Sequence, residues 1–174
     1  ASTSRPVGVE LVAGSPLSIK GRIDRVDLSA DGRSARITDY KTGKLDQYRK
    51  DELRGGTTVQ LPLYMLAAAR LLLSQPGEGT GVEGRYLSVT RNGKFKEVGF
   101  SREALAARRG DLARIANTFA NGVARGVFFA YPDPKVCEWC DYRLACGEGR
   151  EARFARKRAD LTAVDFIRMR EEIS

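Results

Sequence analysis

The alternation of apolar and polar residues in the first quarter of the chain indicates two strands joined by a tight turn. Residues 17–28 alternate as a half-buried strand requires. Asp31-Gly32 is a strong two-residue turn sequence, and residues 34–41 have the composition of the returning strand. We therefore expect a β-hairpin here, followed by a polar, glycine-rich loop over residues 42–56.

A helix and a second hairpin are predicted next. The apolar residues of 58–74 have helical spacing, and Thr57 with Gln60 has the form of a capping box, while Pro62 favours a start near Leu61. Beyond a flexible connection, two strands are expected around a type I′ turn sequence. These are the connection 76–81, the strands 82–90 and 94–100, and the turn Asn92-Gly93.

The remaining pattern is helical. Ser101 can cap an amphipathic helix that ends near Val123 and buries one stripe of residues: Leu105, Leu112, Ile115 and Phe119. Its arginines either line a groove for a nucleic-acid backbone or form a solvated face: Arg102, Arg108, Arg109 and Arg114. Thr162 can start a last helix over 163–172, a tail that leads to or packs on something else. The element order predicts an α/β fold with a mixed sheet.

Composition narrows the class of protein. The 174 residues carry a net charge of +8, which favours a polyanionic partner, although solvated arginine-rich helices give the same excess. No apolar run approaches the roughly 18 residues that span a bilayer, and no secretory signal is visible at the start. We expect a cytoplasmic, bacterial-type protein with no membrane association.

The first hairpin brings two carboxylates together. With a turn at Asp31-Gly32, facing residues have numbers that sum to 63, so Asp24 faces Asp39 with Cβ atoms about 4.5–5.5 Å apart. Lys41, two residues beyond Asp39, shares that face. Facing carboxylates repel unless Lys41 or a divalent cation compensates them, and Mg²⁺ commonly binds one or two carboxylates. The alternative is an exposed face with solvated charges, as we expect for Asp27 opposite Arg36.

Three motifs resemble those of RecB-type nucleases in the PD-(D/E)XK superfamily. They are Gly21-Arg-Ile-Asp24-Arg-Val-Asp27, Asp39-Tyr-Lys41-Thr-Gly43 and Gln60-Leu-Pro-Leu-Tyr64. They occur in the family's order and at plausible spacing. The resemblance implies a restriction-endonuclease-like core with a mixed central sheet flanked by helices, and metal-dependent hydrolysis of DNA phosphodiester bonds.

The resemblance also implies roles for single residues. Asp24 and Asp39 would bind Mg²⁺ or Mn²⁺ with the carbonyl of Tyr40, and Lys41 would be the catalytic lysine. Gln60 and Tyr64, one helical turn apart, would lie along the active-site groove. Glu10 would lie near the metal, or it is a surface residue. The family's upstream histidine is missing, since the chain has no histidine, so we expect either an absent N-terminal part or an incomplete site.

The three cysteines lie close together at the C-terminal side of these motifs. Cys137, Cys140 and Cys146 have the spacing C-x2-C-x5-C, too tight for a disulfide framework and more typical of metal ligands. A zinc site or a thiolate-bound iron–sulfur cluster needs four ligands. Glu138 or Asp141 could complete a zinc site, and three free thiols in a turn are a further alternative.

Iron–sulfur members of this nuclease family, which include AddB-like helicase–nuclease subunits, have three such cysteines after the core and a fourth before it. The resemblance implies a 4Fe–4S cluster in a longer protein, where it pins the end of the domain to its start. With three cysteines in this chain, we expect an empty site.

The expected division is a nuclease core over 1–134 that lacks its N-terminal part, a cysteine segment over 135–150 and a helical tail over 151–174. The leading hypothesis is a DNA exonuclease domain that acts on ends or single strands, with a helicase domain or subunit as partner, in double-strand-break repair. One alternative is an inactive nuclease-like module for DNA binding or partner docking. A second alternative is a zinc-binding structural domain.

Overall fold

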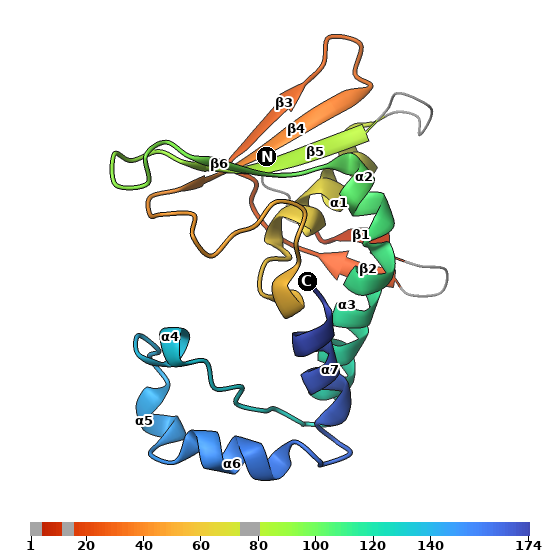
Figure 1. The fold of residues 1–174 in the computed structure, drawn as a ribbon. Coiled ribbons are helices and arrows are strands. Elements are labelled where there is room, and N and C mark those ends of the chain that lie inside the picture. The colour runs from red at the N-terminus through yellow and green to blue at the C-terminus, as the bar shows by residue number, and fades with distance from the viewer. Residues whose placement is uncertain (1–4, 12–15, 74–80) are drawn as a thin grey trace.

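A mixed four-stranded sheet is the larger of the two sheets in the computed structural model, which describes residues 5–11, 16–73 and 81–174. In sheet order its strands are β3 (Arg25–Leu28), β4 (Ser34–Lys41), β5 (Gly81–Ser88) and β6 (Glu97–Phe100). β4 and β5 run parallel, and the outer pairs run antiparallel. The sheet lies at the top of the molecule with helices beneath it (Figure 1). The predicted α/β fold with a mixed sheet is confirmed.

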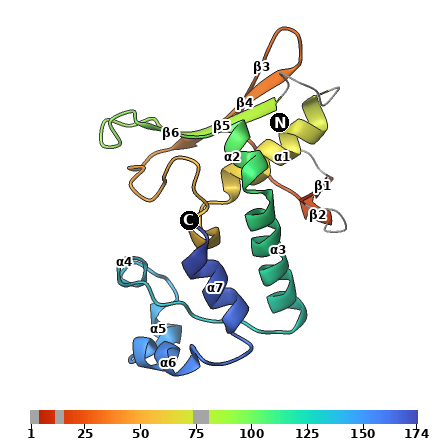
Figure 2. The same ribbon diagram turned by 45° about the vertical axis from the view of Figure 1, so that its right-hand side comes forward.

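Helices α1 (Gln60–Leu72) and α2 (Arg102–Ala107) contact the four-stranded sheet, and α3 (Arg109–Ala124) packs against α2 and α7 (Val164–Glu172). α1 contacts β4 and β5, and α2 contacts β5. α3 continues downwards beside α7, as both views show (Figures 1 and 2). A short two-stranded sheet of β1 (Val7–Glu10) and β2 (Pro16–Ile19) packs against α1 through β1.

Three short helices lie at the end of the molecule opposite the four-stranded sheet (Figures 1 and 2). They are α4 (Pro134–Cys137), α5 (Arg143–Cys146) and α6 (Arg150–Lys157). None of these three helices has a fully buried residue. The cysteine segment therefore adds little to the core, and the division proposed from the sequence stays a prediction.

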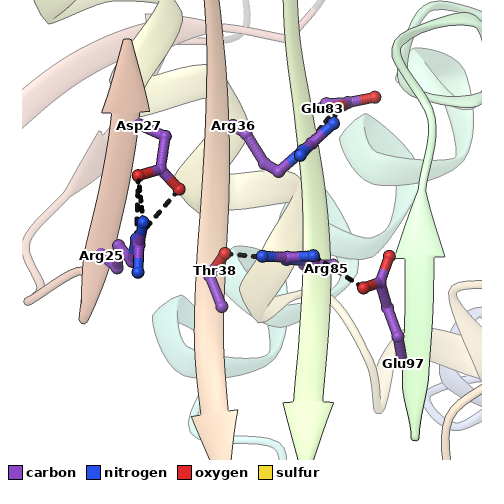
Figure 3. Close-up of polar contacts among 7 residues, drawn as sticks. All are labelled: Arg25, Asp27, Arg36, Thr38, Glu83, Arg85 and Glu97. Carbon is purple, nitrogen blue, oxygen red and sulfur yellow. Dashed lines mark hydrogen bonds and ion pairs between the residues drawn. The ribbon is translucent and has the colours of Figure 1, made fainter.

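The two faces of the sheet differ because side chains alternate along each strand. Ala35, Ile37 and Val82 point inwards and are buried in the core. The outer face carries ion pairs: Arg25 with Asp27, Arg36 with Glu83, and Arg85 with Glu97 (Figure 3). Thr38 lies beside Arg85 on the neighbouring strand and accepts its Nε–H at 3.0 Å (Figure 3). Inward apolar and outward charged residues thus fix which face of β4 can be buried.

The register of the first hairpin is confirmed, but its strands and turn differ from the prediction. Arg25 pairs with Thr38 and Asp27 with Arg36, so facing numbers sum to 63. The predicted strand 17–28 is wrong as one strand, since β2 pairs with β1 and only β3 pairs with β4. The turn is a four-residue loop closed by Ser29 N–H to Ser34 O at 2.9 Å. Asp31 Oδ1 accepts the Ser29 hydroxyl and the Arg33 N–H, which stabilises the wider turn.

The two-residue type I′ turn predicted for the second hairpin is wrong. Gly84 pairs with Phe100 and Leu87 with Glu97, a register that a turn at Asn92-Gly93 cannot give. Positive φ angles occur instead at Lys94 and Phe95. Local side-chain bonds explain the difference, because Thr90 Oγ1 accepts Gly93 N–H and donates to Thr42 O. The loop is wide because it packs against the segment that follows β4.

The helix predictions are mostly confirmed. α1 begins at Gln60, next to the start that Pro62 favours, but the capping box is wrong because the Thr57 hydroxyl donates to Arg54 O instead. Ser101 caps α2 by accepting Ala104 N–H at 3.1 Å, and the helix is interrupted at Arg108 before α3. The predicted connection 76–81 lies outside the described residues except for Gly81, the first residue of β5.

The last helix is part of the core. Met169 and Ile173 are buried, and Ser174 O accepts Leu53 N–H at 2.8 Å. Gly55 has φ +58, and a Cβ there would lie 2.5 Å from Arg170 O, so only glycine fits this approach. The predicted tail packs on the 3₁₀ turn Arg54–Gly56, just before α1. No helix in the described ranges is long and apolar enough to cross a membrane.

Candidate active site

The C-terminal half of β4 places Asp39 and Lys41 side by side on the inner face of the sheet. The Asp39 side chain is only 5% exposed, and its Oδ2 lies 2.6 Å from Lys41 Nζ as an ion pair. No donor in the described residues reaches Oδ2 along a hydrogen-bond direction. A carboxylate buried in this way costs free energy unless a cation compensates it. In this structure Lys41 is that cation.

Lys41 remains protonated at neutral pH. Burial by itself would lower the pKa of Lys41, but the Asp39 carboxylate and, to a smaller extent, Tyr48 together raise that pKa above its usual value. Lys41 Nζ also donates to Gln60 Oε1 at 3.1 Å. The side chain therefore brings a fixed positive charge to the site rather than a proton acceptor.

Asp24 lies at the same end of the β3–β4 pair, just before β3 begins. Its Oδ2 accepts the backbone N–H of Tyr40 at 3.0 Å, so the carboxylate reaches across to the segment between Asp39 and Lys41. Asp24 is exposed, whereas Asp39 is buried. The two carboxylates thus differ in environment, one facing solvent and one facing the core.

Gln60 and Tyr64 continue the chain of contacts on α1. Gln60 Nε2 donates to the Tyr64 hydroxyl at 3.3 Å, as expected for residues one turn apart on one helix face. Gln60 therefore connects Lys41 on β4 with Tyr64 on α1. The structure brings four of the candidate residues into one contiguous network, with Asp24 joined through Tyr40.

Two tyrosines beside Lys41 were not predicted from the sequence. Tyr48, in the loop after β4, stacks on Tyr86 of β5 with ring centroids 3.9 Å apart. Lys41 Nζ lies 5.9 Å from the Tyr48 centroid and 5.3 Å from the Tyr86 centroid. The inward parity of β5 could have indicated Tyr86, but a loop position such as Tyr48 has no periodic signal.

The segment after Lys41 is clamped against the loop between β5 and β6. The buried Ser88 hydroxyl donates to Gly43 O at 3.0 Å, and Val89 N–H donates to Lys41 O at 3.0 Å. A Cβ at Gly93 would lie 1.7 Å from Ser88 Oγ, so the two loops can approach this closely only with glycine there. The clamp limits how far the backbone of Lys41 can move.

Other candidates lie apart from this network. Glu10 is exposed at the end of β1, where Arg109 donates to the carbonyls of Glu10 and Leu11. Within the described ranges, no three histidine, cysteine or acidic residues form a group that could hold a metal ion. Glu10 therefore does not join Asp24 and Asp39, and its role near a metal stays a prediction.

The three cysteines likewise do not form a metal site in the part of the chain that the structure describes. Cys137, Cys140 and Cys146 are half-buried, unpaired thiols on and between α4 and α5. They supply three thiolates at most, and the described residues do not bring them together as a metal site. The residues present therefore do not fit a four-thiolate cluster.

The arginines of α2 and α3 are engaged within the protein. Arg102 pairs with Glu103, Arg108 with Asp111, and Arg114 with Glu172. Because these ion pairs neutralise the helix face, the structure favours the solvated face over a nucleic-acid groove.

The predicted burial of Phe119 is wrong, whereas Leu105, Leu112 and Ile115 are buried as predicted. Phe119 is 48% exposed because it lines a cavity of about 670 Å³ between α3, the turn at 126–129 and α7, and it meets Phe166 edge-on.

The carboxylate pair fits a hard divalent cation. Asp39 Oδ2 is a buried oxygen whose neighbouring cation is Lys41, and Asp24 adds a second carboxylate at the same end of the hairpin. Mg²⁺ typically takes one or two carboxylates and completes its shell with water and substrate oxygens. Asp24 and Asp39 are therefore the residues that could hold such an ion.

Comparison with known proteins places this chain in a family. The profile of the PD-(D/E)XK nuclease superfamily matches residues 1–147, a span that includes the network and all three cysteines. The chain belongs to the PD-(D/E)XK nuclease superfamily, as the motifs predicted.

The most informative relatives are proteins named as a subunit of an ATP-dependent helicase/deoxyribonuclease. The chain is 45% identical over 65 residues to that of Symbiobacterium thermophilum and 40% identical over 62 residues to that of Clostridium tetani. These matches cover 36% and 34% of this chain and 6% and 5% of those proteins. The chain thus spans a small part of the curated relatives it matches. No solved structure matches the chain.

The ion pair can be tested by its effect on stability. In Lys41→Met the Asp39 carboxylate stays buried without its cation, so we expect the free energy of unfolding to fall by about 1–3 kcal/mol in EDTA. Asp39→Asn combined with Lys41→Met should recover most of this loss, as measured by urea unfolding. Lys44→Met, at an exposed position of the next loop, is the control and should change little. An equal cost of Lys41→Met with and without the Asp39 charge would show that the pair does not interact.

Proposed function

We propose that this chain is a DNA nuclease that hydrolyses phosphodiester bonds with Mg²⁺ or Mn²⁺. The observation that carries the proposal is the buried Asp39 carboxylate, whose Oδ2 lies 2.6 Å from Lys41 Nζ, with the Asp24 carboxylate at the same end of the hairpin. Burying a carboxylate costs folding free energy. A carboxylate that ligates a divalent cation explains why the chain keeps a charge in this position. Membership of the nuclease superfamily supports the same conclusion.

Each residue of the network has a distinct part in this proposal. Asp24 and Asp39, with the Tyr40 carbonyl, hold the cation. When bound, the cation supplies Lewis-acid polarisation of the phosphoryl group and a source of hydroxide at neutral pH. The Lys41 ammonium stabilises the negative charge that grows on the phosphoryl oxygens. Gln60 orients Lys41, and Tyr64 orients Gln60 beside the DNA.

DNA cleavage tests the proposal. We expect this chain to cut end-labelled single- or double-stranded DNA with Mg²⁺ or Mn²⁺ and not in EDTA. Loss of the Lys41 charge in Lys41→Ala should lower the rate by about 100-fold or more, since such electrostatic stabilisation commonly contributes this much. Asp27→Asn is the matched control, because Asp27 is an aspartate of the adjacent strand on the opposite face of the sheet, and it should cut normally. Metal-dependent cutting that survives Lys41→Ala would contradict the proposal.

The second candidate function is an inactive module that binds DNA or docks a partner, favoured by the absence of histidine. Asp39→Ala separates the two, with gel-shift binding and cleavage measured on one DNA. The enzyme loses cleavage and keeps binding, whereas a binding module shows no cleavage in either form.

We further propose that the domain acts on DNA ends or single strands beside a helicase, during double-strand-break repair. The support is similarity to proteins whose names describe a subunit of a helicase/deoxyribonuclease. Single-turnover reactions with a duplex, alone and with an added ATP-driven helicase, test this role. Cleavage of the linear duplex should be faster when the helicase unwinds it, and equal cutting of a closed circular duplex without ATP would contradict this role.

The cysteines carry a separate proposal. A 4Fe–4S cluster would need a fourth ligand besides Cys137, Cys140 and Cys146. Iron, sulfide and zinc analysis of protein purified without oxygen tests this, with Cys140→Ala as the matched variant. Iron with sulfide that disappears in Cys140→Ala would support the cluster. Stoichiometric zinc would favour a structural zinc site, and neither metal would favour free thiols.

A further inference from the structure

The tyrosine pair of Tyr48 and Tyr86 lies against the charged end of Lys41, and the chemistry proposed above gives it no part. Tyr86 is the register partner of Asp39 in the parallel β4–β5 ladder, so it is inward-facing and adjacent to the buried carboxylate. Tyr48 approaches from the loop after β4 and stacks on it at an interplanar angle of 29°. Two segments 38 residues apart thus build one aromatic surface beside one ammonium group.

The geometry is that of a cation–π contact. Such contacts stabilise when a cation lies within about 6 Å of a ring centroid. Lys41 Nζ meets this distance for both rings, at 5.3 Å for Tyr86 and 5.9 Å for Tyr48. The ammonium therefore lies beside both rings of the stacked pair as well as beside Asp39.

Both rings are held in place. The Tyr86 side chain is buried, and its hydroxyl accepts Leu61 N–H from the first turn of α1 at 3.3 Å. Burial also raises the pKa of Tyr86, so the phenol stays neutral over the ordinary pH range. Tyr48 N–H donates to the carbonyl of Leu45, whose side chain is buried in the core. A rigid pair can position a flexible lysine, because the lysine then loses its rotamer freedom before substrate binds.

Asp39 has two roles in the proposed site, as the anionic partner of Lys41 and as a ligand of the divalent cation, and the two roles compete. In this structure Asp39 is the anionic partner of Lys41. A divalent cation on Asp39 would take over that charge and repel the ammonium. Of the described contacts of Lys41, Gln60 Oε1 and the two tyrosines, Tyr48 with its hydroxyl as well as its ring, would then remain.

We propose that Tyr48 and Tyr86 are positioning residues that keep the Lys41 ammonium beside Asp39 while a divalent cation occupies the carboxylate. This inference rests on the proposed nuclease function. It assigns two residues to the site that belong to none of its three sequence motifs, and neither touches the reacting atoms.

Position 48 gives the cleaner kinetic test of the two, because Tyr48 is half-exposed at the margin of the core whereas Tyr86 is buried within it. We expect Tyr48→Leu to lower kcat for DNA cleavage by about 3- to 10-fold, the range of a moderate cation–π contact, with an unchanged KM for DNA. Tyr48→Phe and Tyr48→Trp keep a ring face and should retain activity. Equal losses in the leucine and phenylalanine variants would overturn the proposal.

Graded fluorination separates the ring's charge distribution from its packing. Phenylalanine with zero, one, two or three ring fluorines at position 48 has nearly constant shape but a progressively weaker negative face. We expect log kcat to fall stepwise along the series. The same series at the exposed Phe128, far from Lys41 along the chain and on a different surface, is the control and should be flat. A flat series at position 48 would overturn the proposal.

A structural readout decides the inference independently of activity. In protein with ¹³C-labelled lysine, the ε-CH₂ protons of Lys41, assigned by their loss in Lys41→Arg, should be shifted upfield by the rings. We expect this shift to persist with saturating Mg²⁺ and to shrink in Tyr48→Leu. Loss of the shift on adding Mg²⁺ would overturn the inference even if the chain cuts DNA. Absence of cutting with a persistent shift would instead count against the nuclease proposal alone.

Discussion

The ion pair between Asp39 and Lys41 is the interaction on which the rest of the site depends. Asp39 lies on the face of β4 that also carries Ala35 and Ile37, so alternation along the strand takes its carboxylate into the core. A charge in that position is tolerated only with a cation beside it. Lys41, two residues on, is on the same face and close enough to provide it. Because the two residues lie on one strand, β4, the same ion pair stabilises the fold and places the charged groups of the site.

Much of the remaining structure fixes the first turn of α1, which brings Gln60 to Lys41. Tyr86 accepts Leu61 N–H there, and Thr58, just before the helix, donates its hydroxyl to Glu52 O. The C-terminal segment contributes from the other side, since Ile173 O and Ser174 O accept the N–H groups of Gly55 and Leu53. Segments far apart along the chain therefore hold the helix that carries Gln60 and Tyr64. Distant substitutions along this path would act on the site through its geometry.

The sequence predicted the local features well and the tertiary ones less well. Strand alternation and one turn sequence gave the correct register between β3 and β4, because register follows from which residues can be buried. The prediction of the second turn failed because Thr90, which accepts Gly93 N–H, also donates to Thr42 O in a loop far along the chain, and no local pattern encodes that contact. The prediction that Phe119 is buried failed for a similar reason. The helical period identifies the apolar stripe of the helix, but it does not show how far along the stripe other elements pack on it.

The candidate site divides in the same way. Motif resemblance brought together Asp39, Lys41, Gln60 and Tyr64, and the structure joins these four through side-chain contacts of 2.6 to 3.3 Å. Tyr48 could not have been found, because a loop residue has no period and its stacking on Tyr86 exists only after folding. The cysteines are a case in which a clear sequence pattern did not predict the structure. Their spacing is typical of metal ligands, but the described residues do not bring them together as a metal site.

The proposed chemistry requires that Asp24 and Asp39 hold a divalent cation beside Lys41. Anomalous diffraction from crystals soaked in Mn²⁺ tests it most directly, because the manganese signal locates the ion without assumptions about activity. We expect one strong peak in contact with both carboxylates, with Lys41 Nζ still against the rings of Tyr48 and Tyr86. A saturated crystal with no peak at Asp39, or with manganese bound only elsewhere, would contradict it.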